Sequence, residues 1–159
     1  MLDGKVIHIP QLLTTEEAGH YLERLQTVVQ WQPPNSYFHR HTFRYDAKEG
    51  CEVLDELAAI VNSSTGRLVQ GAFCNYYHDG REYTPYHRDP YGCDIAGISF
   101  GTTRDFYFKA DSGGGRTHYR LAHGDLLFFR NEVNGTHRHS VPARTRCHEE
   151  RINITFFLR

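Results

Sequence analysis

The segment Arg151-Ile152-Asn153-Ile154-Thr155-Phe156 alternates strictly between polar and apolar residues. Because successive side chains of a strand point to opposite faces, the alternation predicts a strand with one polar and one apolar face. An arginine on the inner face of an otherwise apolar sheet needs an anionic partner, since an unpaired buried charge is costly. A planar guanidinium suits a carboxylate ligand, and an Asp or Glu of the fold is the alternative partner.

Upstream of this segment the chain reads as a succession of short strands separated by turn residues. The predicted strands cover residues 69–78, 84–88, 95–101, 104–110, 116–121, 125–130, 136–142 and 150–158. Roughly eight strands at this spacing predict an antiparallel sandwich or jelly roll. The glycine-rich segment 111–116 is predicted to be a hairpin tip, because no Gly-Lys-Ser/Thr follows it as in a phosphate loop.

The first third of the chain has a different pattern. A short strand is predicted over residues 5–9, and a capping box at Thr14 and Glu17 begins a helix that runs to about Gln30. A second helix is predicted over residues 51–62, and residues 31–50 are predicted to be a polar, aromatic-rich loop.

The fold class that follows is mostly β with flanking α. We expect a double-stranded β-helix (jelly roll) with two N-terminal helices packed on one sheet. A chain of 159 residues favours a single domain. Within it, residues 1–68 would form the helices and a short substrate lid, and residues 69–159 the jelly-roll core.

Composition narrows the class of protein. Hydrophobic residues make up 39% of the chain and aromatic residues 13%, which indicates a folded globular protein. The net charge is −1, but residues 1–79 hold six Lys and Arg against ten Asp and Glu, and residues 80–159 hold twelve against nine. The basic second half suits an anionic ligand, and ordinary surface scatter is the alternative.

Cysteine usage and hydropathy indicate the compartment. The four cysteines form no C-x-x-C pair, which favours reduced thiols in the cytoplasm or nucleus. The start of the chain does not resemble a signal peptide, and no apolar run approaches the roughly 20 residues of a membrane span. We therefore expect a soluble, intracellular protein without membrane contact, and a monomer.

The strongest local motif is Tyr86-His87-Arg88-Asp89. In a strand, His87 and Asp89 point to the same face, so an imidazole and a carboxylate lie side by side. These are two of the three ligands of the facial triad that binds non-haem Fe(II). A third ligand has two candidates, His137 and His139, and strand parity places both on one face.

Six motifs in this order resemble the AlkB family of Fe(II)/2-oxoglutarate dioxygenases, and the resemblance covers about residues 69–159. The motifs are Asn75-Tyr76-Tyr77 with Asp79-Gly80, His87-Arg88-Asp89, Ser99-Phe100-Gly101 with Arg104-Asp105-Phe106, Leu121-Ala122-His123-Gly124-Asp125-Leu126, His139-Ser140-Val141-Pro142, and Arg151-x-Asn153-x-Thr155-Phe156.

The resemblance implies a ligand set and a reaction. It selects His139 as the third metal ligand, so His87, Asp89 and His139 would be the catalytic iron centre. It assigns 2-oxoglutarate and O2 as co-substrates. Alkylated bases of DNA or RNA would be the substrate, with release of succinate, CO2 and formaldehyde. The residues that would bind 2-oxoglutarate are Asn75, Tyr77, Arg151 and Asn153.

The chain also departs from the family pattern. Phe157 stands where the family usually has a second arginine, and Pro90-Tyr91 follows the H-x-D motif where the repair enzymes have acidic residues. The segment that would cover the substrate is short. Aromatic and basic side chains suit a flipped or single-stranded base. The predicted substrate contacts are Tyr37, Arg40, Phe43, Arg44, Tyr45 and Arg88.

Three hypotheses follow for the function. The first is oxidative demethylation of N-alkylated nucleobases. The second keeps the iron centre but hydroxylates a protein side chain, a free nucleotide or an unmodified base, and the departures at Phe157 and Pro90-Tyr91 motivate it. The third is a metal-binding jelly roll without turnover. In the loop, aromatic rings packed over the sheet are the alternative to a base-binding lid.

Overall fold

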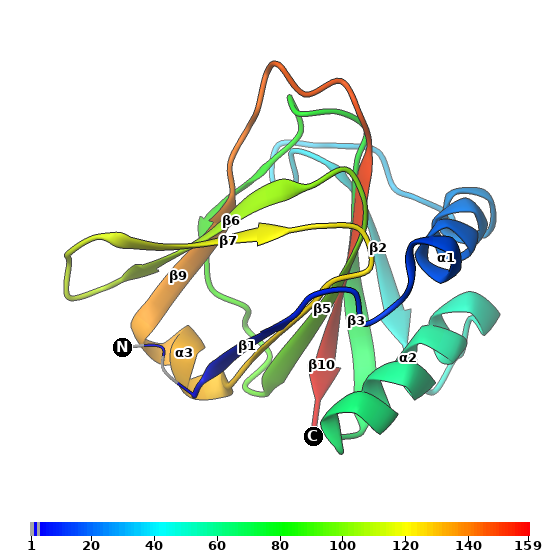
Figure 1. Cartoon of the computed structure of the whole chain (residues 1–159), viewed down its shortest axis with the longest axis horizontal. Coiled ribbons are helices and arrows are strands. Elements are labelled where there is room, and N and C mark those ends of the chain that lie inside the picture. The colour runs from blue at the N-terminus through cyan, green and yellow to red at the C-terminus, as the bar shows by residue number, and fades with distance from the viewer. Residues whose placement is uncertain (1, 3) are drawn as a thin grey trace.

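The computed structural model describes residue 2 and residues 4–159. Two antiparallel sheets face each other, and two helices cover the outer face of the larger sheet (Figure 1). The elements in chain order are β1 (Val6–Ile9), α1 (Thr15–Val28), β2 (His41–Asp46), α2 (Glu52–Thr65), β3 (Val69–Tyr77), β4 (Thr84–His87), β5 (Asp94–Gly101), β6 (Arg104–Ala110), β7 (Arg116–Leu121), β8 (Leu126–Phe129), α3 (Asn131–Thr136), β9 (His137–Val141) and β10 (Arg151–Leu158).

The strand order is that of a jelly roll. The large sheet has the order β1-β8-β5-β10-β3-β2, and the small sheet has the order β4-β9-β6-β7. From β3 to β6 the chain crosses between the sheets at every connection, and it does so again from β7 to β10. Two sheets built in this way enclose a space to which both contribute side chains. The predicted fold class, including the two helices on one sheet, is confirmed.

The strand β10 lies inside the large sheet and determines what faces its two sides. It pairs with β3 on one edge and with β5 on the other. Ile152, Ile154 and Phe156 are fully buried and pack in the core with Leu54 and Leu57 of α2. The polar positions of the same strand therefore face the space between the sheets, as the alternation predicted.

The structure corrects the prediction that residues 31–50 form a loop. Residues His41–Asp46 form β2, which pairs with β3 at the edge of the large sheet. The pattern is hard to identify because its inward positions hold Thr42 and Arg44 rather than a uniform run of apolar residues. The short helix α3 was also not predicted, since its six residues are too few to show a helical period.

The second helix extends beyond the predicted end at residue 62. It continues to Thr65 and is closed by Gly66, whose φ of 68° is in the left-handed region that glycine adopts readily. The four cysteines are free. None of the helices in the described part of the chain combines the length and the apolar content that crossing a membrane would require.

The predicted capping box at the start of α1 is confirmed. The hydroxyl of Thr14 accepts a hydrogen bond from the backbone N–H of Glu17 at 3.1 Å, and the Glu17 carboxylate accepts one from the Thr14 N–H at 3.0 Å. These two bonds satisfy backbone donors that the first turn of a helix leaves free. They fix the point from which α1 packs against the large sheet.

We predict that Thr14→Ala lowers the free energy of unfolding by about 1 kcal/mol, because it removes the hydroxyl of the N-cap. Urea denaturation followed by circular dichroism measures the change. Thr14→Ser keeps the hydroxyl and should stay close to the wild type. A loss in the serine variant equal to that in the alanine variant would show that the cap does not contribute.

Candidate metal centre and co-substrate pocket

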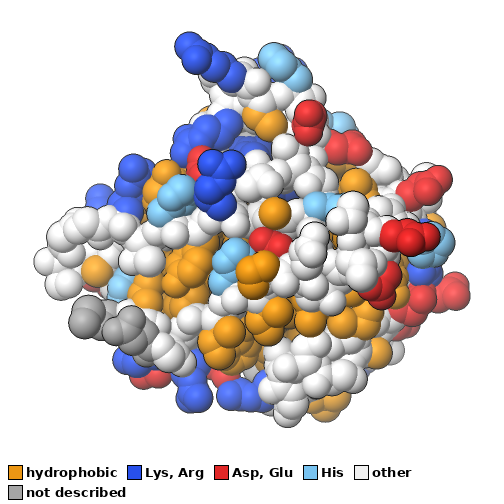
Figure 2. All heavy atoms as spheres, viewed as in Figure 1, with side chains coloured by type: hydrophobic (Ala, Val, Ile, Leu, Met, Phe, Trp, Pro, Cys, Tyr) orange, Lys and Arg blue, Asp and Glu red, His pale blue; other side chains and the backbone are white. Residues whose placement is uncertain are grey.

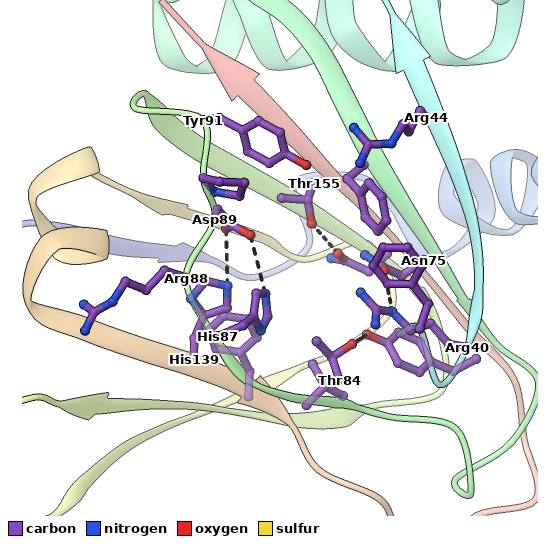
Figure 3. Close-up of a pocket in the computed structure, with 17 residues that line it drawn as sticks. Arg40, Arg44, Asn75, Thr84, His87, Arg88, Asp89, Tyr91, His139 and Thr155 are labelled. Atoms are coloured by element: carbon purple, nitrogen blue, oxygen red, sulfur yellow. Dashed lines mark hydrogen bonds and ion pairs between the residues drawn. The ribbon is translucent and has the colours of Figure 1, made fainter. Parts of the chain in front are cut away.

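The small sheet presents two imidazoles side by side. His87 at the end of β4 is paired in register with His139 of β9, and their ring centroids are 4.3 Å apart. Asp89, two residues after His87, turns its carboxylate toward both rings (Figure 3). Its Oδ1 lies 3.5 Å from His87 Nε2, and its Oδ2 lies 3.2 Å from His139 Nε2.

These three side chains form a group that could hold a metal ion. Adjacent ligands of an octahedral ion with bonds of about 2.1 Å lie roughly 3 Å apart, and the two separations are close to this value. The Nδ1 of His87 lies 2.8 Å from the carbonyl oxygen of Pro85, a contact that directs Nε2 toward the metal position. The donor set therefore fits the facial triad of a non-haem iron site.

Electrostatics favour the protonation states that bind a metal. Burial alone would raise the pKa of Asp89, but the charges and hydrogen bonds of His139 and His87 outweigh it and hold the pKa well below its usual range. Burial lowers the pKa of His139, although the attraction of Asp89 opposes the shift. A neutral imidazole and an ionised carboxylate are the forms that metal ligands need.

The geometry distinguishes the two candidate third histidines. His139 is 5% exposed and lies against Asp89, with the ring of Phe106 stacked 5.3 Å away. The Nδ1 of His137 instead lies 2.8 Å from the hydroxyl of Thr136. His137 belongs to neither of the metal-binding groups found among residue 2 and residues 4–159.

The large sheet holds a buried cation, Arg151, beside Tyr77, although Arg151 itself is not among the residues that line the pocket of the metal group. Arg151 is 1% exposed, its Nη2 donates to the hydroxyl of Ser99 at 3.0 Å, and its guanidinium lies 5.4 Å from the ring centroid of Tyr77. Among the described residues, the Nε and Nη1 of Arg151 have no hydrogen-bond partner. Burial lowers the pKa of Arg151 to about 10, so the side chain stays charged at neutral pH. A carboxylate ligand would supply the missing acceptors.

The other predicted co-substrate residues lie beside Arg151. The register of β10 on β3 pairs Arg151 with Tyr77 and Asn153 with Asn75. Asn75, Tyr77 and Asn153 line the same pocket as the metal group. The hydroxyl of Tyr77 lies 2.7 Å from that of Thr84, and this contact links the large sheet to β4.

The predicted substrate contacts divide into two sets. Arg40 and Arg44 line the pocket, and the Nε of Arg40 donates to Asn75 Oδ1 at 2.8 Å. Phe43 and Tyr45 point to the helix side of β2, where Tyr45 hydrogen-bonds Asp55 at 2.5 Å. Their predicted place at the substrate needs correction, because alternate residues of a strand face opposite sides.

Tyr37 and Arg88 also differ from the prediction. Tyr37 is 83% exposed and is not among the residues that line the pocket. The backbone of Arg88 borders the pocket, but its guanidinium points away from it (Figure 3). That guanidinium binds the carboxylate of Asp111 at 2.6 Å and the carbonyl oxygen of Asn134 at 3.0 Å.

The sequence analysis did not identify several residues of the pocket. They come from five different strands and from the loops that precede β2 and follow β4, and no local motif joins them. The side chains concerned are Phe38, Phe73, Thr84, Pro90, Tyr91, Phe106, Val141 and Thr155. Phe106 had one signal, its alternation with Phe108 along a strand, and Thr155 had its place on the polar face of β10.

Comparison with known proteins agrees with this site. A family model described as the 2OG-Fe(II) oxygenase superfamily matches residues 35–156. Relatives described as "DNA oxidative demethylase ALKBH2" are 33% identical over 117 residues in Homo sapiens and 36% identical over 117 residues in Mus musculus, covering 65% of this chain in each case. The Arabidopsis thaliana relative of the same description is 31% identical over 135 residues, covering 67% of this chain.

The matched segments make up 45%, 49% and 42% of these three relatives, so the chain spans less than half of their length. The solved structure of OsALKBH1 superimposes with a TM-score of 0.72 at 13% identity and covers 99% of both chains, a likeness of fold. The chain belongs to the 2OG-Fe(II) oxygenase superfamily. Within that class, its sequence is similar to that of relatives of the AlkB type. Membership implies Fe(II), 2-oxoglutarate and O2, which the His-Asp-His group suits.

We predict that His139→Ala weakens Fe(II) binding by more than about 100-fold, because it removes a direct ligand rather than an outer partner. His137→Ala is the matched control, two residues away on the same strand face, and should stay within about threefold of wild type. Isothermal titration calorimetry with Fe(II) under anaerobic conditions measures the affinity of both variants. Equal losses in the two variants would contradict the assigned triad.

Proposed function

We propose that the chain is an Fe(II)/2-oxoglutarate-dependent dioxygenase that oxidatively demethylates N-alkylated bases of nucleic acid. Residues 1–159 would act as one catalytic domain. One observation carries the proposal: the His-Asp-His group lines the same pocket as Tyr77, and the buried, incompletely paired guanidinium of Arg151 lies against the ring of Tyr77. His87, Asp89 and His139 would hold the iron, and Arg151 would supply the positive charge for a carboxylate of the co-substrate.

Each polar residue has a proposed task. His87, Asp89 and His139 would hold Fe(II), and Arg151 with Tyr77 would take the distal carboxylate of 2-oxoglutarate. Bound iron, with 2-oxoglutarate and O2, supplies oxidation of a C–H bond and converts the co-substrate to succinate and CO2. The register pair Asn75 and Asn153 would orient the co-substrate.

The rest of the pocket suits a planar, apolar group beside a phosphate. The rings of Phe38, Phe73 and Tyr91 line it together with Arg40 and Arg44. Base rings stack on aromatic side chains, and arginine neutralises the phosphates that flank the base. An N-methyl group of such a base, once hydroxylated, leaves as formaldehyde. The names of the ALKBH2 relatives support this substrate class.

The distribution of charge supports a nucleic-acid partner. Lys and Arg side chains gather over the region of β6 and β7, and Asp and Glu side chains gather toward α1 (Figure 2). On the outer face of the small sheet, Arg116 lies 4.1 Å from the ring centroid of Tyr107, and Lys109 lies 5.8 Å from that of Tyr86. Cations interleaved with aromatic rings are typical of surfaces that follow a phosphate backbone.

The proposal predicts that the chain, with Fe(II), ascorbate and 2-oxoglutarate, removes methyl groups from single-stranded oligonucleotides that carry N-methylated bases. Succinate and formaldehyde should form in equal amounts, and mass spectrometry should show the loss of one methyl group. DNA, RNA and double-stranded forms tested side by side define the preference. His139→Ala provides the inactive control.

Two results would redirect the proposal. A gain of one oxygen by a peptide, a nucleotide or an unmodified base, without formaldehyde, would select a hydroxylase that uses the same centre. The stack of Tyr91 on Phe157, 3.6 Å between ring centroids, is the feature that favours this alternative, because it gives one end of the pocket an apolar wall. Iron binding without succinate in any assay would select a non-catalytic binding protein.

We predict that Arg151→Gln raises the KM for 2-oxoglutarate about 10- to 100-fold, the equivalent of one or two charge-assisted hydrogen bonds. Fe(II) affinity should change little, because Arg151 is not a ligand in this proposal. Arg146→Gln, which removes an exposed arginine, is the control and should leave both values unchanged. An unchanged KM in Arg151→Gln would exclude Arg151 as the anchor.

A further inference from the structure

A second group of metal-ligating side chains lies outside the pocket. It consists of His41 at the start of β2, His78 directly after β3, and Glu82 in the turn that leads to β4. Tyr77 faces the pocket, so its neighbour His78 points to the opposite side of the large sheet. None of the three residues lines the pocket of the His87 group.

The separations within this group suit a small divalent ion. The Nδ1 of His41 lies 3.2 Å from Glu82 Oε2, and the Nδ1 of His78 lies 3.2 Å from Glu82 Oε1. One ligand atom of each residue lies within 4.8 Å of the other two. Tetrahedral bonds of about 2.0–2.1 Å to zinc place adjacent ligands roughly 3.3 Å apart, which the two imidazole–carboxylate separations match.

The surrounding residues hold the group in place. The ring of His78 stacks on Tyr76 with 4.1 Å between centroids and 11° between planes. Tyr76 is itself fixed, because its hydroxyl donates to Glu150 at 2.7 Å and its ring packs 5.3 Å from that of Trp31. The backbone N–H of His78 donates to Glu82 Oε1 at 2.6 Å, which leaves Oε2 directed at His41. Supported side chains of this kind lose little entropy when an ion binds.

Hydrogen bonds alone do not account for the arrangement. The rings of His41 and His78 are only 4.0 Å apart, so two positive charges there would repel each other. The Nδ1 of His41 is buried, and although it lies 3.2 Å from Glu82 Oε2, it forms no hydrogen bond of good geometry with any of the described residues. This ring nitrogen lies beside the imidazole of His78 and the carboxylate of Glu82. The three side chains together form a donor set of two histidines and one carboxylate. That set is a recurring one for zinc.

We propose that His41, His78 and Glu82 form a second metal site, which binds Zn²⁺ with an open fourth position and is separate from the iron centre. The ion would tie the edge strand β2 to the turn between β3 and β4. That strand carries Arg44 and directly follows Arg40, and the strand β4 after the turn carries Thr84 and His87; all four residues line the pocket. Zinc would therefore act as a structural clamp on one wall of the pocket.

The test uses the full chain in a His139→Ala background, which removes the first site. Zn²⁺ titration by calorimetry should then show one equivalent bound, and Co²⁺ should give the visible absorption of a tetrahedral ion. Adding Glu82→Gln should weaken the binding of Zn²⁺ at least 100-fold and abolish the Co²⁺ absorption. Glu82→Gln keeps an acceptor for the His78 N–H, so folding should be preserved, and circular dichroism checks it.

The control adds His20→Ala, which removes an exposed histidine of α1 and should leave the bound equivalent unchanged. Anomalous scattering from crystals of the wild-type chain soaked in Zn²⁺ locates the ion independently of any variant. A peak between His41, His78 and Glu82 supports the site. Failure to bind one equivalent in the His139→Ala background, or equal affinity after Glu82→Gln, would overturn it.

Discussion

The guanidinium of Arg151 is buried inside the large sheet, and two of its nitrogens lack hydrogen-bond partners among the described residues. Burial of a charge is unfavourable unless its donors are satisfied. The contacts to Ser99 and the ring of Tyr77 compensate for only part of that cost. A ligand that supplies carboxylate oxygens would complete the pairing and stabilise the folded state by mass action. The preference for an anion is thus built into the sheet and does not depend on a flexible loop.

Neither sheet contains the whole site. The small sheet provides the imidazoles through the register pair His87 and His139, and the large sheet provides the proposed anion-binding residues through the pair Arg151 and Tyr77. The chain crosses between the sheets along most of its length, so His87, His139 and Tyr77 line one pocket, and Arg151 lies behind the ring of Tyr77. The distance between the proposed metal position and the proposed anchor would then be set by the packing of the two sheets, which the helices on the outer face support.

The local sequence pattern was sufficient to predict those features that depend on the geometry of a single strand. The alternation in residues 151–156 predicted both faces of β10, and the i, i+2 spacing predicted that His87 and Asp89 would lie together. Parity could not separate His137 from His139, because both point the same way and only the distance to Asp89 distinguishes them. The strand β2 was missed for a related reason. Phe43 and Tyr45 were grouped with Arg44 by composition, but their faces are opposite.

The departure at residue 157 changes where the positive charge lies, and it does not remove that charge from the pocket. Phe157 stacks on Tyr91, so this end of β10 is apolar. Arg44 of β2 lines the same pocket. Burial raises the pKa of the Tyr91 phenol, and the positive charge of Arg44 opposes that rise. The cation therefore comes from an edge strand and not from the centre of the sheet. Edge strands move more easily than central ones. The contacts that fix β2 to the rest of the large sheet therefore determine how precisely the guanidinium of Arg44 is positioned.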